Sequence, residues 1–258
     1  MGNFCCTCEP QNELDKYKII DYVGNGAYGK IYVVKKKKSK KVSVMKSVKN
    51  IRAIDNEIIY FDLNLNHDNL IKYDDLFFYN KKLYIIMDRY DIDLLDYLSD
   101  KGKISEVQTK IYVKQILSAL RELEKLNYYH LDLKLENILL NYRDRNRIVL
   151  TDFGFIDNIR TNYKQIQVKN IIGTRLYLAP EITKVNIISK KSDIWSLGII
   201  TYMMLNNFRL ECYNEKFIRA SCKELSDDCV DFLIRSLEGN FVYRMSIIDC
   251  LLHKWLSY

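Results

Sequence analysis

Three glycines near the start of the chain have a spacing that is found both in strand-to-helix turns and in β-hairpins. Gly24, Gly26 and Gly29 have the spacing G-x-G-x-x-G. A dinucleotide-binding fold places this motif at the start of a helix, with an acidic residue about 20 positions further on. Here the motif instead enters a β-branched and aromatic stretch at 31–34, and a second apolar stretch follows at 42–48. The sequence therefore predicts a β-hairpin whose backbone can lie close over phosphates, and it disfavours the dinucleotide fold.

A lysine inside the second predicted strand requires a nearby anion. Lys46 lies among apolar residues, where a cation is costly unless it meets a carboxylate or an anionic ligand. The next segment has the spacing of one apolar helix face at Ile54, Ile58, Phe61 and Leu65. Glu57 lies on that face, and an inward-facing glutamate is costly without a partner. We therefore expect Glu57 to pair with Lys46; the alternative is an exposed Glu57 at the edge of the apolar face.

The composition changes from strand-like to helical after residue 87. Residues 83–87 form an apolar strand, and Ser105 is the predicted N-cap of a long helix, with Gln108 as the third residue of a capping box. The predicted buried face of this helix consists of Tyr112, Ile116, Ala119, Leu120, Leu123 and Leu126. The polar connection that follows residue 87 is therefore the expected boundary between two lobes.

The stretch after this helix alternates polar residues with leucines. Residues 130–137 are His-Leu-Asp-Leu-Lys-Leu-Glu-Asn, and an ordinary apolar strand follows at 138–140. Alternation is typical of a half-buried strand. An acid, a base and an amide this close together are also consistent with a loop that its leucines hold rigid while its polar side chains converge. The stretch alone does not decide between the two.

Three further motifs follow in a fixed order. They are Asp-Phe-Gly at 152–154, Gly-Thr followed by Ala-Pro-Glu within 173–181, and Asp-x-Trp-x-x-Gly at 193–198. Together with the glycine hairpin, Lys46 and residues 130–137, these motifs make the chain resemble the eukaryotic protein kinases from about residue 17 onward.

The resemblance implies an α+β protein kinase fold with two lobes. We expect a small β-rich N-lobe with one helix at about 17–87, a hinge at about 88–93 and a larger helical C-lobe at about 94–258. Glu181 and Arg244 match the buried ion pair of the family's C-lobe, which makes them structural residues.

The resemblance also implies which residues bind ATP. They are Val23, Gly24, Asn25, Gly26, Ala27, Tyr28, Gly29, Lys30 and Ile31 over the phosphates, Lys46, and the backbone at Asp88 and Tyr90 beside the adenine. Lys46 would hold the α- and β-phosphates and pair with Glu57.

The catalytic roles follow from the same resemblance. Asp132 is the expected catalytic base for the substrate hydroxyl, and Lys134 would steady the transferring phosphoryl group. Asn137 and Asp152 would hold Mg²⁺, a hard cation that prefers oxygen ligands. Lys134 and the Gly173-Thr174 pair resemble the residues found at these positions in serine/threonine kinases. The implied activity is transfer of the ATP γ-phosphate to Ser and Thr hydroxyls of a protein substrate.

Among several departures from the family, the one at Leu131 bears on regulation. Leu131 stands where the family has the arginine of His-Arg-Asp, which in many kinases pairs with a phosphate on the segment from Asp152 to Glu181. Without that arginine, phosphorylation of Thr161 or Tyr163 loses its usual anchor. We therefore expect activity that depends little on phosphorylation of this loop.

The tail at residues 1–16 is a candidate for acylation. Gly2 follows the first methionine as in the myristoylation pattern, and Cys5 and Cys6 are candidates for palmitate. Two acyl chains would matter because one myristoyl chain binds a membrane only marginally. No apolar leader opens the chain, so we expect a protein of the reducing cytoplasm, associated with the cytoplasmic face of a membrane. The alternative is a disordered tail with stray thiols.

Net charge leaves several partners open. The value of +7 suits nucleotides, phosphorylated surfaces and anionic membranes alike. The lysine-rich stretch at 35–41 is expected to be a solvated hairpin turn, with a membrane-facing patch as the alternative. A nucleic-acid binder would rest on net charge alone, so we expect no nucleic-acid partner, and we expect a monomer.

The main alternative to an active kinase is a pseudokinase scaffold, although Lys46, Asp132 and Asp152 are all present.

Overall fold

The computed structural model describes residues 11–26, 29–37, 39–165, 173–207 and 214–257. The chain divides into two compact units. The small unit comprises the described part of residues 1–66 together with Ile71–Arg89, and the large unit comprises His67–Leu70 and the described part of residues 90–258. The change of unit after Arg89 falls inside the predicted hinge, whereas residues 67–70, expected in the N-lobe, belong to the large unit.

Residues 67–70 belong to the large unit because their hydrogen bonds are made there. The Asn69 side-chain amide donates to Gln115 Oε1 at 2.7 Å and to the Ile148 carbonyl at 2.8 Å. The Leu150 N–H in turn donates to the Asn69 carbonyl at 2.9 Å. The resemblance, which implied an N-lobe of about 17–87, does not reveal these long-range bonds.

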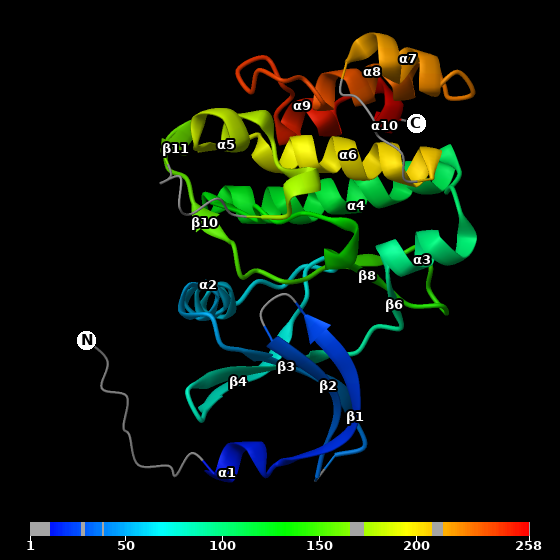
Figure 1. Cartoon of the computed structure of the whole chain (residues 1–258). Coiled ribbons are helices and arrows are strands. Elements are labelled where there is room, and N and C mark those ends of the chain that lie inside the picture. The colour runs from blue at the N-terminus through cyan, green and yellow to red at the C-terminus, as the bar shows by residue number, and fades with distance from the viewer. Residues whose placement is uncertain (1–10, 27–28, 38, 166–172, 208–213, 258) are drawn as a thin grey trace. The chain divides into compact units, whose positions relative to one another are not determined.

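An antiparallel sheet of five strands forms most of the small unit, in the order β1-β2-β3-β5-β4 (Figure 1). The strands are β1 (Tyr17–Gly26), β2 (Gly29–Lys36), β3 (Val42–Val48), β4 (Tyr73–Tyr79) and β5 (Lys82–Asp88). Helix α1 (Gln11–Leu14) precedes β1, and helix α2 (Ile51–Asp62) follows β3. One buried cluster of this unit contains Tyr17, Val34, Met45, Phe77, Tyr84 and Ile86.

The glycine motif lies in a β-hairpin, as the sequence predicts. Gly26 pairs with Gly29 across β1 and β2, and β2 pairs with β3 so that Ile31 is opposite Lys46. A Cβ atom on Gly29 would lie 1.6 Å from the Ser47 carbonyl oxygen. The sheet itself therefore requires glycine at this position.

Helix α2 buries Glu57, but its buried face differs from the predicted one. Asn50 caps the helix by accepting a hydrogen bond from the Ala53 N–H at 3.1 Å. The buried residues are Ala53, Ile54, Glu57 and Tyr60. Phe61, expected on the buried face, is 39% exposed, and Leu65 lies beyond the end of the helix. The observed face follows the i, i+4, i+7 spacing from Ala53, which turns Phe61 outward.

The large unit is mainly helical. Its helices are α3 (Leu94–Lys101), α4 (Glu106–Lys125), α5 (Pro180–Val185), α6 (Ser192–Asn206), α7 (Glu215–Ser221), α8 (Asp227–Ser236), α9 (Ile247–Leu251) and α10 (Lys254–Ser257), with short 3₁₀ turns η1 (Leu135–Asn137) and η3 (Arg175–Tyr177). Helix α4 lies beside α6, which also packs against α8 (Figure 1). Among the described residues, no helix has the length and apolar character needed to cross a membrane.

Short strands complete the large unit. They are β6 (Ile92–Asp93), β7 (Tyr128–Tyr129), β8 (Ile138–Leu140), β9 (Ile148–Leu150), β10 (Asp157–Asn158), β11 (Tyr163–Gln165) and β12 (Ile187–Ser189). The strands β6, β8 and β9 form one sheet, while β10 pairs with β7 and β11 pairs with β12. This architecture, with a β-sheet unit and a helical unit, is the predicted α+β fold.

Helix α4 begins where the sequence predicts and ends earlier than its predicted apolar face. The Ser105 hydroxyl accepts a hydrogen bond from the Gln108 N–H at 3.3 Å. Leu126, expected in the buried face, is 42% exposed because it is the C-cap residue, where the chain leaves the helix.

Candidate active site

Residues 130–137 form a loop in the large unit that ends in the 3₁₀ turn η1. The half-buried strand is therefore the wrong alternative, and the rigid loop is the right one. The loop is rigid because the side chains of Leu131, Leu133 and Leu135 are all buried. Asp132 and Asn137 are buried as well, so the loop holds its polar groups within the protein.

Asp193, at the start of α6, holds the backbone of this loop. Its two carboxylate oxygens accept hydrogen bonds from the N–H groups of His130 and Leu131, each at 2.8 Å. These bonds hold Leu131 at φ 62°, in the left-handed region, which costs a non-glycine residue about 1–2 kcal/mol. Complete burial raises the pKa of Asp193. The Asp-x-Trp-x-x-Gly motif contains Asp193, but the motif alone does not reveal this role.

His130 links the loop to the segment that carries Asp152. Its Nδ1 accepts a hydrogen bond from the Asp132 N–H at 3.3 Å, so its Nε2 carries the proton and donates to the Thr151 carbonyl at 3.1 Å. The His130 ring also packs against Phe153, with ring centroids 5.0 Å apart. Since both ring nitrogens are engaged with backbone, His130 supports the loop and is not placed as a base.

The Asp132 carboxylate receives three side-chain donors. Lys134 Nζ lies 3.0 Å from Oδ2, and the Thr174 hydroxyl donates to Oδ1 at 3.0 Å. Asn137 Nδ2 lies 3.3 Å from Oδ2 and donates to the Asp132 carbonyl at 2.8 Å. Lys134 also donates to the Thr174 hydroxyl at 3.0 Å, which closes the cluster. These donors therefore fix the direction of the Asp132 carboxylate. The Thr174 hydroxyl shows that a hydroxyl group can approach this carboxylate within hydrogen-bond distance.

Thr174 is a member of this cluster that sequence reasoning did not assign. It reaches Asp132 because the preceding residue, Gly173, has φ 92° and lies against the loop. A Cβ atom on Gly173 would lie 2.8 Å from both the Leu131 carbonyl oxygen and Leu178 Cδ2. The Gly173-Thr174 pair was the available signal, since glycine permits the close approach that brings the threonine hydroxyl to the carboxylate.

Asn137 and Asp152 provide oxygen atoms suited to Mg²⁺. The Asn137 amide nitrogen is directed at Asp132, which leaves the amide oxygen as its group for a cation. The Thr151 N–H donates to the Asn137 carbonyl at 3.0 Å, which joins the two segments, and Asp152 follows with φ 67°. No group of three or more His, Cys, Asp or Glu side chains in the described residues could hold a metal. An amide and a carboxylate fit Mg²⁺, which usually takes its remaining ligands from water and substrate phosphates.

The small unit contains the predicted ion pair. Lys46 Nζ lies 2.7 Å from Glu57 Oε1, and the two side chains are 8% and 0% exposed. The pair is buried, so each charge compensates the desolvation of the other. Of the other predicted nucleotide residues, Val23–Gly26 end β1, Gly29–Ile31 begin β2, and Asp88 ends β5, whereas Ala27 and Tyr28 lie outside the described residues.

Comparison with known proteins identifies the family. Residues 17–256 match the family described as protein kinase domain. Calcium-dependent protein kinase 5 of Plasmodium falciparum is 31% identical over 95% of this chain and 45% of its own length. Myosin light chain kinase 3 of Rattus norvegicus is 30% identical over 92% of this chain and 32% of its own length. The chain therefore belongs to the protein kinase family, and it spans less than half the length of these two relatives.

Proposed function

We propose that this chain is an active protein kinase that transfers the γ-phosphate of ATP to serine and threonine hydroxyls. The observation that carries the proposal is the buried Asp132 carboxylate, fixed by Lys134, Thr174 and Asn137. Phosphoryl transfer needs little covalent help from a protein, so catalysis rests on positioning and on neutralising charge. This cluster supplies both.

Each of the candidate site residues in the two units has a role in this proposal. Asp132 accepts the proton of the substrate hydroxyl, and Lys134 places positive charge beside the transferring phosphoryl group. Lys46 binds the α- and β-phosphates of ATP, with Glu57 holding the lysine. Bound Mg²⁺, for which Asn137 and Asp152 provide ligands, would neutralise charge on the phosphate oxygens.

The test is transfer of labelled phosphate from ATP to a generic basic protein, with Asp132→Asn as the inactive control. Phosphoamino-acid analysis of the product would show whether serine and threonine, or tyrosine, are modified. Nucleotide binding without any transfer by the wild type would support the pseudokinase alternative, which Leu131 favours because it removes a family residue. Transfer that is lost only in the control would exclude that alternative.

Activity independent of loop phosphorylation is the second part of the proposal. Residues 155–165 are held in the large unit by pairing of β11 with β12, and within this stretch Lys164 Nζ lies 2.7 Å from Asp157 Oδ1. The Lys190 N–H also donates to the Asn162 carbonyl at 3.2 Å. These contacts position residues 155–165 without a phosphate, which agrees with the absence of the family arginine at Leu131.

The double variant Thr161→Ala/Tyr163→Phe tests this part. Thr161 and Tyr163 provide all the hydroxyl side chains between Gly154 and Gly173, and both are exposed. We expect the variant to retain kcat within about twofold, since surface substitutions usually change free energies by about 0.5 kcal/mol or less. Wild-type protein treated with a phosphatase is the matched control and should behave alike. A loss of activity in both samples would contradict the proposal.

Membrane tethering is the third part, and its acylation sites, Gly2, Cys5 and Cys6, lie outside the described residues. Charge supports it. Residues 13–41 contain nine lysines and three acidic residues, so this stretch carries +6 of the net +7. A basic surface close to an acylated tail would add attraction to the anionic cytoplasmic leaflet. We propose a monomer held at that surface.

Binding to lipid vesicles tests the tether. The acylated chain should sediment with vesicles that contain phosphatidylserine, and the Cys5→Ser/Cys6→Ser variant should bind them weakly, because a single myristoyl chain is a marginal anchor. The acylated Lys35→Gln/Lys37→Gln variant should bind at least about tenfold more weakly, since each lysine near an anionic surface contributes about 1 kcal/mol. Equal binding by all three proteins would contradict the tether.

A further inference from the structure

The Glu57 carboxylate has a second partner in the small unit besides Lys46. The Tyr73 hydroxyl donates a hydrogen bond to Glu57 Oε2 at 2.5 Å, while Lys46 occupies Oε1 at 2.7 Å. Tyr73 begins β4, Lys46 lies in β3 and Glu57 lies in α2. The three side chains therefore join the helix to two strands of the sheet through one carboxylate.

Burial makes this second partner necessary. Glu57 is 0% exposed and Tyr73 is 7% exposed, so solvent cannot replace the tyrosine hydroxyl. A buried acceptor that loses its donor carries the full cost of its desolvation, and that cost is larger for a charged group. Without the hydroxyl, the carboxylate would have to rotate or shift to satisfy Oε2. Either movement changes where Glu57 holds the Lys46 ammonium group.

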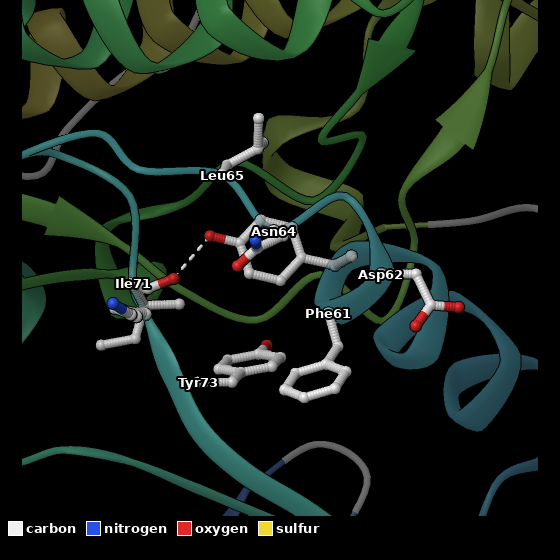
Figure 2. A pocket seen from close by; sticks show the side chains of 8 residues that line it. Phe61, Asp62, Asn64, Leu65, Ile71 and Tyr73 are labelled. Atoms are coloured by element: carbon white, nitrogen blue, oxygen red, sulfur yellow. Dashed lines mark hydrogen bonds between the residues drawn. The ribbon is translucent and has the colours of Figure 1, made fainter.

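Tyr73 is buried at the edge of a pocket and packs against a neighbouring ring. Figure 2 shows Tyr73 beside Phe61 at a pocket of about 280 Å³, which is lined by residues of α2, β4 and the chain between them. The Tyr60 ring meets the Tyr73 ring edge-on, with centroids 5.1 Å apart. The Tyr60 hydroxyl itself donates to the Ile71 carbonyl, the bond drawn as a dashed line. Ring packing and the hydroxyl bond to Glu57 together hold Tyr73 in place.

We propose that Tyr73 is a positioning residue for nucleotide binding: its hydroxyl fixes the Glu57 carboxylate, which in turn fixes Lys46 for the ATP phosphates. The inference rests on the proposed function for the role of Lys46. It adds a residue that does not touch ATP and acts through two others. Tyr73 therefore affects the use of ATP and has no direct effect on the protein substrate.

Tyr73→Phe removes the hydroxyl and keeps the ring. We expect kcat/KM for ATP to fall about tenfold or more, as for the loss of one hydrogen bond to a charged group, with KM for the protein substrate unchanged. Tyr60→Phe is the matched control: it removes the hydroxyl of the neighbouring buried tyrosine, which bonds to a backbone carbonyl. It should lower thermal stability and leave kcat/KM for ATP unchanged. A Tyr73→Phe variant with an unchanged kcat/KM for ATP, whether or not it loses stability, would overturn the proposal.

A double-mutant cycle separates positioning from a general structural effect. In a Glu57→Leu background, where no acceptor remains for the Tyr73 hydroxyl, Tyr73→Phe should change ATP affinity less than about twofold. An equally large effect in both backgrounds would show that Tyr73 does not act through Glu57 and would overturn the proposal. Binding of a fluorescent ATP analogue gives the same comparison without catalysis. A wild type that binds the analogue but transfers no phosphate would therefore contradict the proposed kinase activity alone.

Discussion

Replacing Asp132 by asparagine is expected to lower kcat for phosphate transfer about 100- to 10,000-fold, the usual contribution of a positioned general base. The amide has nearly the size of the carboxylate but cannot accept the proton of a substrate hydroxyl. Its position stays defined, because Thr174 and Asn137 still surround it. The loss should therefore appear in kcat, measured with labelled ATP at saturating substrate, and not in the KM for ATP.

Two controls separate loss of chemistry from loss of structure. The Asp132→Asn protein should bind a fluorescent ATP analogue as tightly as the wild type, because the nucleotide contacts are assigned to Lys46 and to other residues. The same change at Asp231, a carboxylate that is 52% exposed on α8, should leave kcat within about twofold. An Asp132→Asn enzyme that retains more than about one tenth of wild-type kcat would exclude Asp132 as the base.

The parts of the fold that sequence predicted depend on local patterns. The glycine hairpin was predicted because the motif continues into β-branched residues, and α4 because Ser105 and Gln108 form a cap three residues apart. Both signals involve neighbours along the chain. The boundary residues were less well predicted: Leu126 continued the apolar spacing of its helix, but the backbone had already left the helix there.

The contacts that complete the site could not be predicted in this way. Residues 130–137 have the alternation of a strand, but Asp193 accepts the N–H groups of His130 and Leu131 that a strand would offer to its neighbour. Asp193 lies more than 60 positions along the chain from both of them. Thr174 and Tyr73 likewise meet Asp132 and Glu57 through tertiary contacts. The motifs therefore predict which side chains carry the chemistry. The side chains that orient them are identified only in the folded structure.

The Glu181–Arg244 pair is expected to have the largest effect on stability. Replacing Arg244 by methionine should lower the free energy of unfolding by about 3–5 kcal/mol at neutral pH, because it leaves the buried Glu181 carboxylate without its counter-ion. The guanidinium forms two bonds of 2.8 Å to the Glu181 carboxylate, and both side chains are at most 2% exposed. Arg244 Nε also donates to the Glu238 carbonyl at 2.9 Å. Chemical denaturation of both proteins would measure the difference.

The dependence on pH tests whether the cost is electrostatic. Burial alone would raise the pKa of Glu181, but hydrogen bonds and charge from Arg244 outweigh it, so its pKa lies below the ordinary value. In the wild type, the contribution of the ionised Glu181 to the free energy of unfolding is fully present at a pH above the ordinary carboxyl pKa. It is lost as the pH falls through the lowered pKa of the folded protein. In Arg244→Met, burial should raise the pKa of Glu181, so the penalty disappears once the carboxyl is protonated. The difference between the two proteins should therefore narrow as the pH is lowered to the carboxyl range.

A matched surface pair shows how much of the effect comes from burial. Arg235 lies 3.8 Å from Asp231 on α8, and these two side chains are 54% and 52% exposed. Arg235→Met should cost less than about 1 kcal/mol, since solvent screens an exposed pair. If Arg244→Met cost no more than Arg235→Met, the buried pair would not stabilise the large unit. A loss of about 3–5 kcal/mol at Arg244 would instead show that the buried ion pair makes a large contribution to the stability of the large unit.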